Sequence, residues 1–306
     1  MTCLYFTESD VERLLTPRAV TNALEEAFRG LARGEAVQAP RLRVKHGAHV
    51  LHNLPCVSRA LGLAGVKSYL SGPAGVSFAT LVFELESCRL KAVVESNRLG
   101  QLRTGCATAL ACRYLAVPGP QVLALFGTGT VARGQLEALD DELDLQEVRI
   151  FSRARENRER FRRWAAERLG LEVLPAATVA EAAEGANLVV TATSAAQPFL
   201  ESSMLPPECH VNAVGANWFR RREIGESVVR DSGRIVVDDR EQAGLEAGEL
   251  EGIDPQRLES LADLVSAHFG TAPSRHDRPP RTLFKSLGVA IEDLAAASLL
   301  IPPPLA

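Results

Sequence analysis

Residues 122–139 read VLALFGTGTVARGQLEAL, and this stretch decides the fold. A short apolar run, typical of a buried strand, leads into two glycines and then into a helical pattern. In that strand–turn–helix context, the sequence G-x-G-x-x-A indicates a dinucleotide-binding loop. Gly127 permits the tight turn, Gly129 lets the backbone approach a pyrophosphate, and Ala132 allows the helix to pack closely on the strand.

The neighbouring loop residues belong to the same expected site. Thr128, Thr130 and Val131 lie where the helix begins, and a helix N-terminus offers free amides and a positive dipole end to phosphate groups. A tight turn that binds no ligand is the alternative that the glycines alone leave open.

The end of the next strand bears on the choice of cofactor. An NAD site places Asp or Glu here to bind the ribose 2′-hydroxyl, whereas a cation accommodates the 2′-phosphate of NADP. This chain has Ser152, Arg153 and Arg155 and no acid at that point. Because a guanidinium matches phosphate oxygens, we expect NADP in preference to NAD. Solvated surface arginines are the alternative.

Short apolar runs alternate with helical patterns beyond the VPGP stretch at residues 117–120. This alternation predicts an α/β fold, a Rossmann-type doubly wound parallel sheet over residues 118–285. Thr193 and Ser194 end its fourth strand, where they are expected to touch the cofactor; a plain turn is the alternative. Residues 1–117 and 286–306 form a second, discontinuous α+β domain.

That second domain is expected to combine helices with antiparallel hairpins. A capping box at Thr7–Asp10 and the pair Thr16-Pro17 begin two helices within the first ~34 residues, which we expect to be helical. Hairpin turns are expected near His46-Gly47 and Ser87-Cys88. One further helix is expected from Arg103 to Ala116, and a last helix, SLGVAIEDLAAASLLI, is expected to return to this domain.

Bulk composition excludes several classes of function. The 306 residues carry a net charge of −4, which gives no reason to expect a nucleic acid or an anionic membrane as partner. No apolar run approaches the roughly 18 residues that span a bilayer, and acids stand where a signal peptide carries basic residues, so we expect a cytoplasmic protein. The six cysteines form no CxxC pair and lack His at metal spacing, so we expect reduced thiols and no metal site.

Six segments, in order from residue 39 to residue 297, resemble the ornithine cyclodeaminase/mu-crystallin family of cyclodeaminases, alanine dehydrogenases and cyclic ketimine reductases. The motifs ExNxLxxxRTxxA and KSxGxAxxD are the most specific part of the resemblance. The segments are APRLRV, GVKSYLSGP, ESNRLGQLRTGCATALACRYLA, FGTGTVARGQLEAL, VNAVGANWFRRREI and LFKSLGVAIEDLAAA.

The resemblance implies that Arg41, Lys67 and Arg103 hold the α-carboxylate of a substrate. If Arg103 opens a helix, its guanidinium and the helix amides converge on one anion. Lys67 lies among small and apolar residues, an unusual place for a surface charge. Next to an imine it would act as a proton donor if its surroundings lower its pKa. Surface ion pairs are the alternative for all three.

The resemblance also marks weaker positions and one departure. Family members that cyclise ornithine or oxidise alanine carry Asp where this chain has Asn217. Because an amide cannot take a proton from an ammonium group, ornithine cyclisation is not expected here. Gly288 is expected to close the nicotinamide pocket, while Asp293 on the same helix is a candidate for a solvated charge. His52 either faces the pocket or is a buried structural histidine.

The sequence therefore predicts an NADPH-dependent reductase of small cyclic ketimines, such as pyrroline-2-carboxylate or piperideine-2-carboxylate. The alternatives are an acyclic amino acid dehydrogenase of alanine or opine type, an ornithine cyclodeaminase, and a non-enzymatic NADPH-binding protein like a crystallin. A homodimer is expected through the first domain, because the resemblance implies it and hairpin edges would otherwise be exposed.

Overall fold

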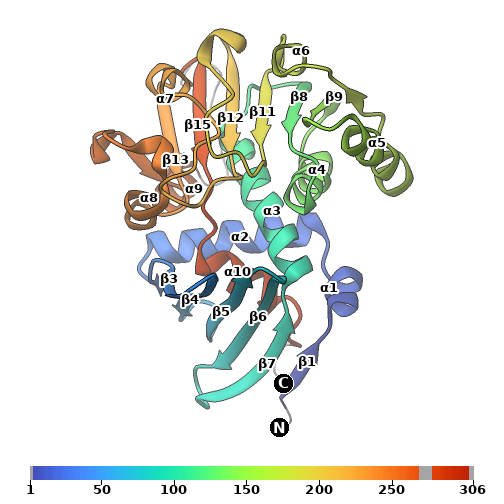
Figure 1. The fold of residues 1–306 in the computed structure, drawn as a ribbon. Helices are drawn as coiled ribbons and strands as arrows, with labels where there is room; N and C mark the ends of the chain where they lie inside the picture. Colours follow the sequence, from blue (N-terminus) through green and yellow to red (C-terminus); the bar gives the residue numbers. More distant parts are fainter. Residues whose placement is uncertain (1–2, 269–277, 303–306) are drawn as a thin grey trace. The chain divides into compact units, whose positions relative to one another are not determined.

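The computed structural model describes residues 3–268 and 278–302. The chain divides into two compact units, here called unit 1 (Met1–Ala107 with Gly288–Ala306) and unit 2 (Thr108–Leu287) (Figure 1). The sequence placed these divisions at 117/118 and 285/286. The roles expected for the two domains remain predictions at this point.

Unit 1 combines a mixed sheet with helices. Two of its helices begin at the expected caps: the Thr7 side chain and Asp10 form a capping box, and the Thr16 hydroxyl accepts a hydrogen bond from the Ala19 amide. A short first strand, Leu4–Phe6, was not expected. The elements are β1 Leu4–Phe6, α1 Glu8–Leu14, α2 Pro17–Ala32, β2 Ala36–Gln38, β3 Leu42–His46, β4 His49–Ser58, β5 Leu63–Gly72, β6 Gly75–Glu84, β7 Arg89–Glu95, the first half of α3 Asn97–Leu115, and α10 Ala290–Ser298.

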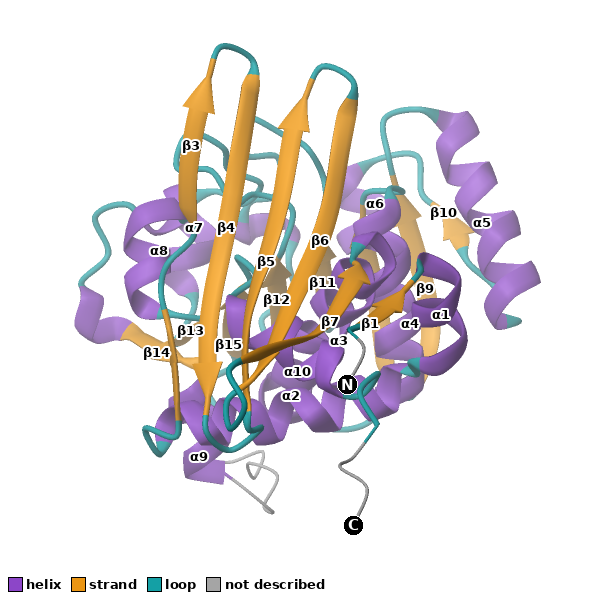
Figure 2. Ribbon diagram, turned by 90° about the horizontal axis from the view of Figure 1, so that it is seen from below, coloured by secondary structure: helices purple, strands orange, loops and turns teal. Residues whose placement is uncertain are grey.

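The sheet of unit 1 has the order β1-β7-β6-β5-β4-β2, and β3 pairs with β4. Every pairing is antiparallel except that of β1 with β7. Both predicted hairpins, β3–β4 and β6–β7, are confirmed, whereas β5 was missed (Figure 2). Most residues of β5 are partly buried on both faces, so its sequence lacks the alternation that reveals a strand with one wet face.

Helix α10 covers one face of this sheet and confirms that the end of the chain returns to the first unit. It packs against α2, β4, β5 and β6. The approach is close, because a Cβ added to Gly65 on β5 would lie 2.9 Å from Leu294 Cδ1. The other face carries exposed apolar side chains, including the cross-strand row Val44, Leu51 and Leu70, which are 57%, 40% and 49% exposed.

Helix α3 begins six residues earlier than the sequence indicated. The carboxylate of Glu8 accepts hydrogen bonds from the backbone amides of Asn97 (2.8 Å) and Arg98 (2.7 Å) and so caps the helix at Asn97. Arg103 therefore lies inside the helix and does not open it. The expectation that its guanidinium joins free helix amides around one anion is wrong.

Unit 2 is the predicted doubly wound α/β sheet. Its strands follow the order β10-β9-β8-β11-β12-β15-β13-β14, and all of these pairings are parallel. The elements are β8 Gln121–Phe126, α4 Thr130–Glu142, β9 Leu145–Phe151, α5 Arg155–Leu169, β10 Leu174–Pro175, α6 Val179–Ala183, β11 Leu188–Thr191, η1 Ser202–Met204, β12 Cys209–Ala213, α7 Glu226–Asp231, β13 Arg234–Val237, α8 Arg240–Glu246, η2 Gly248–Leu250, η3 Pro255–Arg257, β14 Leu258–Ser260, α9 Leu261–His268 and β15 Arg281–Lys285.

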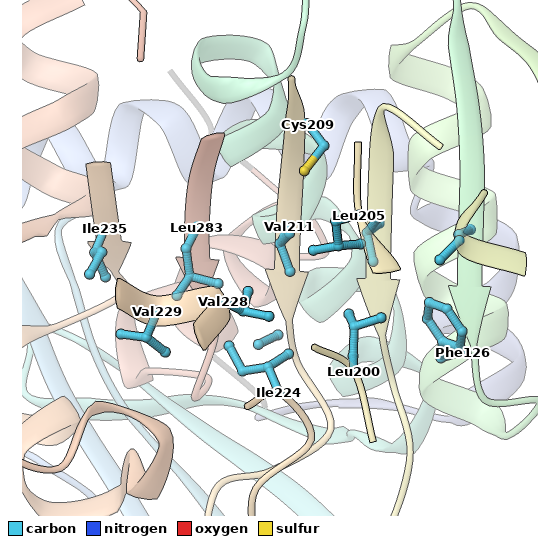
Figure 3. Close-up of a cluster of buried hydrophobic side chains, with 14 of the residues drawn as sticks. Phe126, Leu200, Leu205, Cys209, Val211, Ile224, Val228, Val229, Ile235 and Leu283 are labelled. Atoms are coloured by element: carbon cyan, nitrogen blue, oxygen red, sulfur yellow. The ribbon is translucent and has the colours of Figure 1, made fainter. Parts of the chain in front are cut away.

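The order of strands in unit 2 creates one reversal point. From β8 the chain adds β9 and β10 on one side and then β11 and β12 on the other. Dinucleotides bind at such a reversal, beyond the carboxyl ends of the strands. A buried apolar cluster that includes Phe126, Val211 and Leu283 holds this framework together (Figure 3).

Candidate active site

The glycine loop of unit 2 lies at the reversal point, directly after β8. Gly127 has φ +112°, and a Cβ added there would lie 2.2 Å from the Ala192 carbonyl oxygen. Only glycine fits such a position. Gly129 is the N-cap of α4 and has open space beside it, while Ala132 is buried against the unit. The loop thus exposes the first amides of a 13-residue helix.

The side chains after β9 lie at the neighbouring strand end. Ser152 is partly buried, and Arg153 and Arg155 are exposed, the latter as the first residue of α5. Arg158, which the sequence did not single out, donates to the Ser152 carbonyl and lies 5.9 Å from the Phe151 ring centroid. The strand end is therefore cationic, as the sequence shows, with one more arginine close to it.

The ends of β11 and β12 are joined by a buried carboxylate that the sequence did not reveal. Glu223 accepts hydrogen bonds from groups on both strand ends, including the Thr193 hydroxyl at 2.7 Å. Ser194 is exposed, and Asn217, two residues after Gly215, is partly buried. Glu223 follows three arginines in the sequence, and no local pattern marks it. Its burial depends on partners distant in the sequence.

A buried lysine supports the segment that carries Asn217. Lys285, at the end of β15, donates to the Ala216 carbonyl and lies 3.4 Å from Glu249 Oε1. Both charged side chains are fully buried. The KSxG motif pointed to this region, but β15 itself was not predicted.

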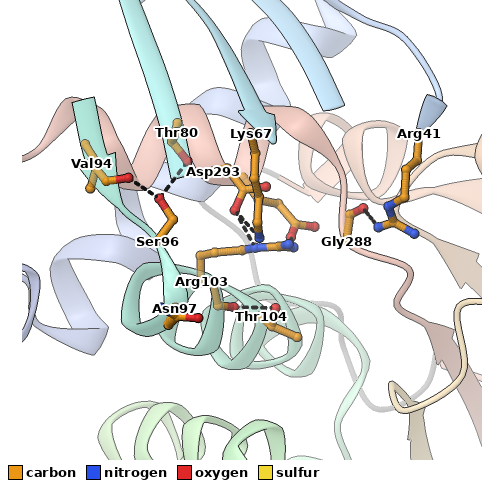
Figure 4. A network of polar contacts seen from close by, with 12 residues as sticks. Arg41, Lys67, Thr80, Val94, Ser96, Asn97, Arg103, Thr104, Gly288 and Asp293 are labelled. Atoms are coloured by element: carbon orange, nitrogen blue, oxygen red, sulfur yellow. Dashed lines mark hydrogen bonds and ion pairs between the residues drawn. The ribbon is translucent and has the colours of Figure 1, made fainter. Parts of the chain in front are cut away.

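Unit 1 gathers a second polar cluster between β5, α3 and α10. Lys67 Nζ lies 2.9 Å from Asp293 Oδ1, and the same oxygen is 2.9 Å from Arg103 Nε. Figure 4 shows Lys67, Arg103 and Asp293 pointing toward one another. Arg103 also pairs with Glu292. Lys67, Arg103 and Asp293 are only 4%, 5% and 1% exposed. The surface ion pair is therefore excluded for Lys67 and Arg103, and the solvated position considered for Asp293 is wrong.

Gly288 connects Arg41 to this cluster. Arg41 Nη2 donates to the Gly288 carbonyl at 2.8 Å. Gly288 has φ +76°, and a Cβ there would lie 2.6 Å from Arg103 Nη1. Arg41, Lys67 and Arg103, which come from distant parts of the sequence, thus belong to one buried group. Gly288 packs against Arg103, and its expected place at the nicotinamide stays a prediction.

The electrostatics of the cluster favour an added anion and a reactive lysine. Among its five charged side chains, three are cations and two are the carboxylates Glu292 and Asp293. The pKa of Lys67 is lowered to about 8, first by burial and then by the Arg103 cation, while Asp293 opposes the shift. A group with a pKa near neutrality transfers protons efficiently in both directions.

His52 lies on the inner face of the same sheet. Its ring stacks on Tyr69, with 4.1 Å between ring centroids, and its Nε2 is 3.1 Å from the Ser71 hydroxyl. Burial lowers the pKa of His52 to about 4, and the cations Arg43 and Arg41 add to the shift. The histidine is therefore neutral near pH 7, which fits the structural interpretation.

The described part of the chain has neither a cluster of metal ligands nor a helix that could cross a membrane. Among residues 3–268 and 278–302, no three His, Cys, Asp or Glu side chains form a group that would hold a metal ion. Within the same residues, no helix is long and apolar enough to cross a membrane.

The two units together define an α/β protein with a dinucleotide-type parallel sheet and a second, α+β unit. The model of the ornithine cyclodeaminase/mu-crystallin family matches residues 3–301, and the chain belongs to this family. The mouse ketimine reductase mu-crystallin is 34% identical over 224 residues, which cover 72% of this chain and 68% of the relative.

Two solved structures are similar to this chain over nearly its whole length. The Thermococcus litoralis delta(1)-pyrroline-2-carboxylate reductase, in complex with NADH and L-proline, superimposes with a TM-score of 0.88 at 26% identity and covers 97% of this chain and 96% of its own. An archaeal alanine dehydrogenase dimer with bound NAD gives a TM-score of 0.88 at 28% identity, with 98% of this chain and 95% of its own covered.

Proposed function

We propose that this chain reduces small cyclic ketimines, pyrroline-2-carboxylate or piperideine-2-carboxylate, to the corresponding L-imino acids with NADPH. In the coarser terms of its family, it is an NAD(P)-dependent oxidoreductase that acts on C=N or CH–NH bonds. The observation that carries the proposal is the buried group of Lys67, Arg103 and Asp293, because it supplies an anion site and a proton donor at one place.

Each side chain of this group has a distinct task in the proposed reaction. Arg41 and Arg103 bind the substrate carboxylate, since three cations face only two carboxylates in the group. Lys67, with a pKa of about 8, donates a proton to the imine nitrogen as it becomes an amine. Asp293 holds the Lys67 ammonium in place and keeps its pKa from falling further.

Unit 2 holds the cofactor in this proposal. The Gly127–Ala132 loop fits a pyrophosphate, because Gly129 leaves open space beside the first amides of α4. When bound, NADPH supplies the hydride that adds to C2 of the imine. Ser152, Arg153 and Arg155 support a preference for the 2′-phosphate, although the two solved relatives hold NAD or NADH.

Asn217 distinguishes this proposal from ornithine cyclisation. Removing ammonia from ornithine needs a base for the δ-amine, and an amide side chain is not one. Reduction of a preformed cyclic imine needs a hydride, a carboxylate clamp and a proton for nitrogen. Because Asn and Asp have nearly the same shape, Asn217→Asp should fold like the wild type, and it tests whether a base at this position adds deaminase activity.

An acyclic amino acid dehydrogenase is the second candidate. The likeness to the archaeal alanine dehydrogenase over 98% of this chain favours it, and an acyclic 2-imino acid presents the same carboxylate and C=N group. The buried group of Arg41, Lys67 and Arg103 argues against a non-enzymatic binding protein, because such a protein needs no carboxylate clamp. An NADPH-oxidation screen over cyclic imines, over 2-oxo acids with ammonia or amines, and over ornithine separates these candidates.

We further propose a homodimer in which a second copy of the chain covers the open face of the unit 1 sheet. Val37, Val44 and Leu51 on this face are 70%, 57% and 40% exposed. Monomeric proteins seldom leave such contiguous apolar surface in water. The archaeal alanine dehydrogenase, which shares this fold, is a dimer.

A further inference from the structure

We propose that Glu223 is a positioning residue that shapes the nicotinamide end of the dinucleotide site in unit 2. The inference rests on the proposed dinucleotide binding and goes beyond it, because Glu223 belongs to neither the glycine loop nor the carboxylate clamp. Its side chain is fully buried, and the residues that it contacts all belong to unit 2.

Four donors converge on this one carboxylate. Oε1 accepts from the Thr193 amide at 2.6 Å and from the Thr193 hydroxyl at 2.7 Å. Oε2 accepts from the Thr191 hydroxyl at 2.9 Å and from the Gly215 amide at 2.6 Å. Residues at the ends of two adjacent parallel strands, β11 and β12, are therefore tied to the same side chain.

The segment that Glu223 fixes presses against the glycine loop. A Cβ added to Gly127 would lie only 2.2 Å from the Ala192 carbonyl oxygen. The Ala192 amide donates a hydrogen bond to the Phe126 carbonyl at the end of β8. At Gly215 a Cβ would lie 2.5 Å from Glu223 Oε1 and 2.3 Å from the Thr193 carbonyl. The reversal point between β8 and β11 is thus closely packed, and Glu223 sets its geometry.

The strand order tells which half of a dinucleotide would meet this segment. In a doubly wound sheet the adenosine ribose lies at the end of the second strand and the pyrophosphate at the first loop. Here these are the ends of β9 and β8, so the nicotinamide half of a bound dinucleotide would extend to the other side of β8, toward β11 and β12. The segment held by Glu223 is on that side.

Only a carboxylate satisfies this arrangement. Two of the four donors are backbone amides, Thr193 and Gly215, one on each oxygen of Glu223. A glutamine would turn its NH₂ group toward one of these amides in either orientation, and a backbone N–H cannot accept. The Thr193 hydroxyl also accepts from the Ala195 amide at 3.1 Å. Thr193 therefore helps to fix the loop, in addition to any contact with the cofactor.

The test measures binding of NADPH and of ADP, which lacks the nicotinamide half, to the wild type and to Glu223→Gln. We expect the variant to bind NADPH about tenfold more weakly, equivalent to ~1.4 kcal/mol, and to bind ADP within about twofold of the wild type. The matched control is Glu259→Gln, which removes a carboxylate that pairs with Arg234 at 2.7 Å on the far strands β13 and β14. The control should lower the melting temperature and leave both affinities unchanged.

Three results would overturn the inference: equal loss of NADPH and ADP affinity, unchanged NADPH affinity in Glu223→Gln, or the same selective loss in the control. If Glu223→Gln does not fold, Thr191→Val removes the buried hydroxyl that donates to Oε2 at 2.9 Å and should show the same selective loss at about threefold. A wild type that binds neither ligand contradicts the proposed function itself and so is distinguishable from a failure at Glu223.

Discussion

Replacing Asp293 by asparagine should shift the pH dependence of imine reduction. Asp293 Oδ1 lies 2.9 Å from Lys67 Nζ. Its charge partly offsets the lowering of the Lys67 pKa by burial and by Arg103, which leaves that pKa at about 8. Asparagine keeps the oxygen acceptor and removes the charge. Without that opposing charge, the pKa of Lys67 must fall.

The size of the shift follows from the contact. A hydrogen bond between charged groups contributes about 1.5–3 kcal/mol, and ~1.36 kcal/mol corresponds to one pH unit. Since reduction needs the protonated lysine, kcat/KM for reduction should fall as pH rises through about 8 in the wild type. In Asp293→Asn the same fall should occur about one to two pH units lower.

The assay follows NADPH oxidation with a cyclic 2-carboxylate imine over a pH range of about 5.5 to 9.5, which includes both expected inflections. Glu292→Gln is the matched control, because it removes a neighbouring carboxylate whose partner is Arg103. The control should move the inflection by less than half as much. If Asp293→Asn retains the wild-type inflection, or if both variants move it equally, Lys67 is not the proton donor.

Three further outcomes are expected. Lys67→Ala should abolish imine reduction and leave NADPH affinity nearly intact, because Lys67 lies in unit 1 and the glycine loop in unit 2; titration of NADPH by fluorescence checks this, and loss of binding would count against the separate roles. Arg153→Ala should weaken NADPH binding by about ten- to a hundredfold with little effect on NADH, and a wild type that binds NADH equally well or more tightly would contradict the NADP preference. Light scattering should give a dimer at micromolar concentration, and Leu51→Asp, which places a charge on the open sheet face, should give a monomer; a salt-independent monomer in the wild type would refute the interface.

Local patterns allowed the fold of unit 2 and several boundaries of unit 1 to be predicted. The glycine loop at Gly127 and the helix caps at Thr7 and Thr16 each depend on a few consecutive residues, so they can be predicted from the local sequence. Strand β15 was missed because it is only five residues long and wholly buried. Three of its residues, Arg281, Thr282 and Lys285, are polar, so the strand shows neither an apolar run nor an alternating pattern.

The contacts that build the candidate site depend on residues far apart in the sequence. The start of α3 is fixed by Glu8, 89 residues before Asn97. The buried Asp293 has Lys67 as its ion-pair partner, 226 residues away in the sequence. The buried Glu223 accepts hydrogen bonds from the ends of two strands that precede it in the chain. Charge and local pattern alone do not distinguish such carboxylates from solvated ones. The family resemblance marked Lys67 through GVKSYLSGP and included Asp293 in the motif KSxGxAxxD, but it did not mark Glu223.

The most direct test of the proposed reaction compares two substrates with the wild-type protein. In the presence of NADPH, we expect reduction of a cyclic 2-carboxylate imine to the L-imino acid. The reaction is monitored by the loss of absorbance of the reduced cofactor, and the product is then identified. With ornithine and NAD, we expect no release of ammonia, because Asn217 supplies no base. Robust NAD-dependent conversion of ornithine to proline would contradict both the role given to Asn217 and the proposed place of this chain within its family.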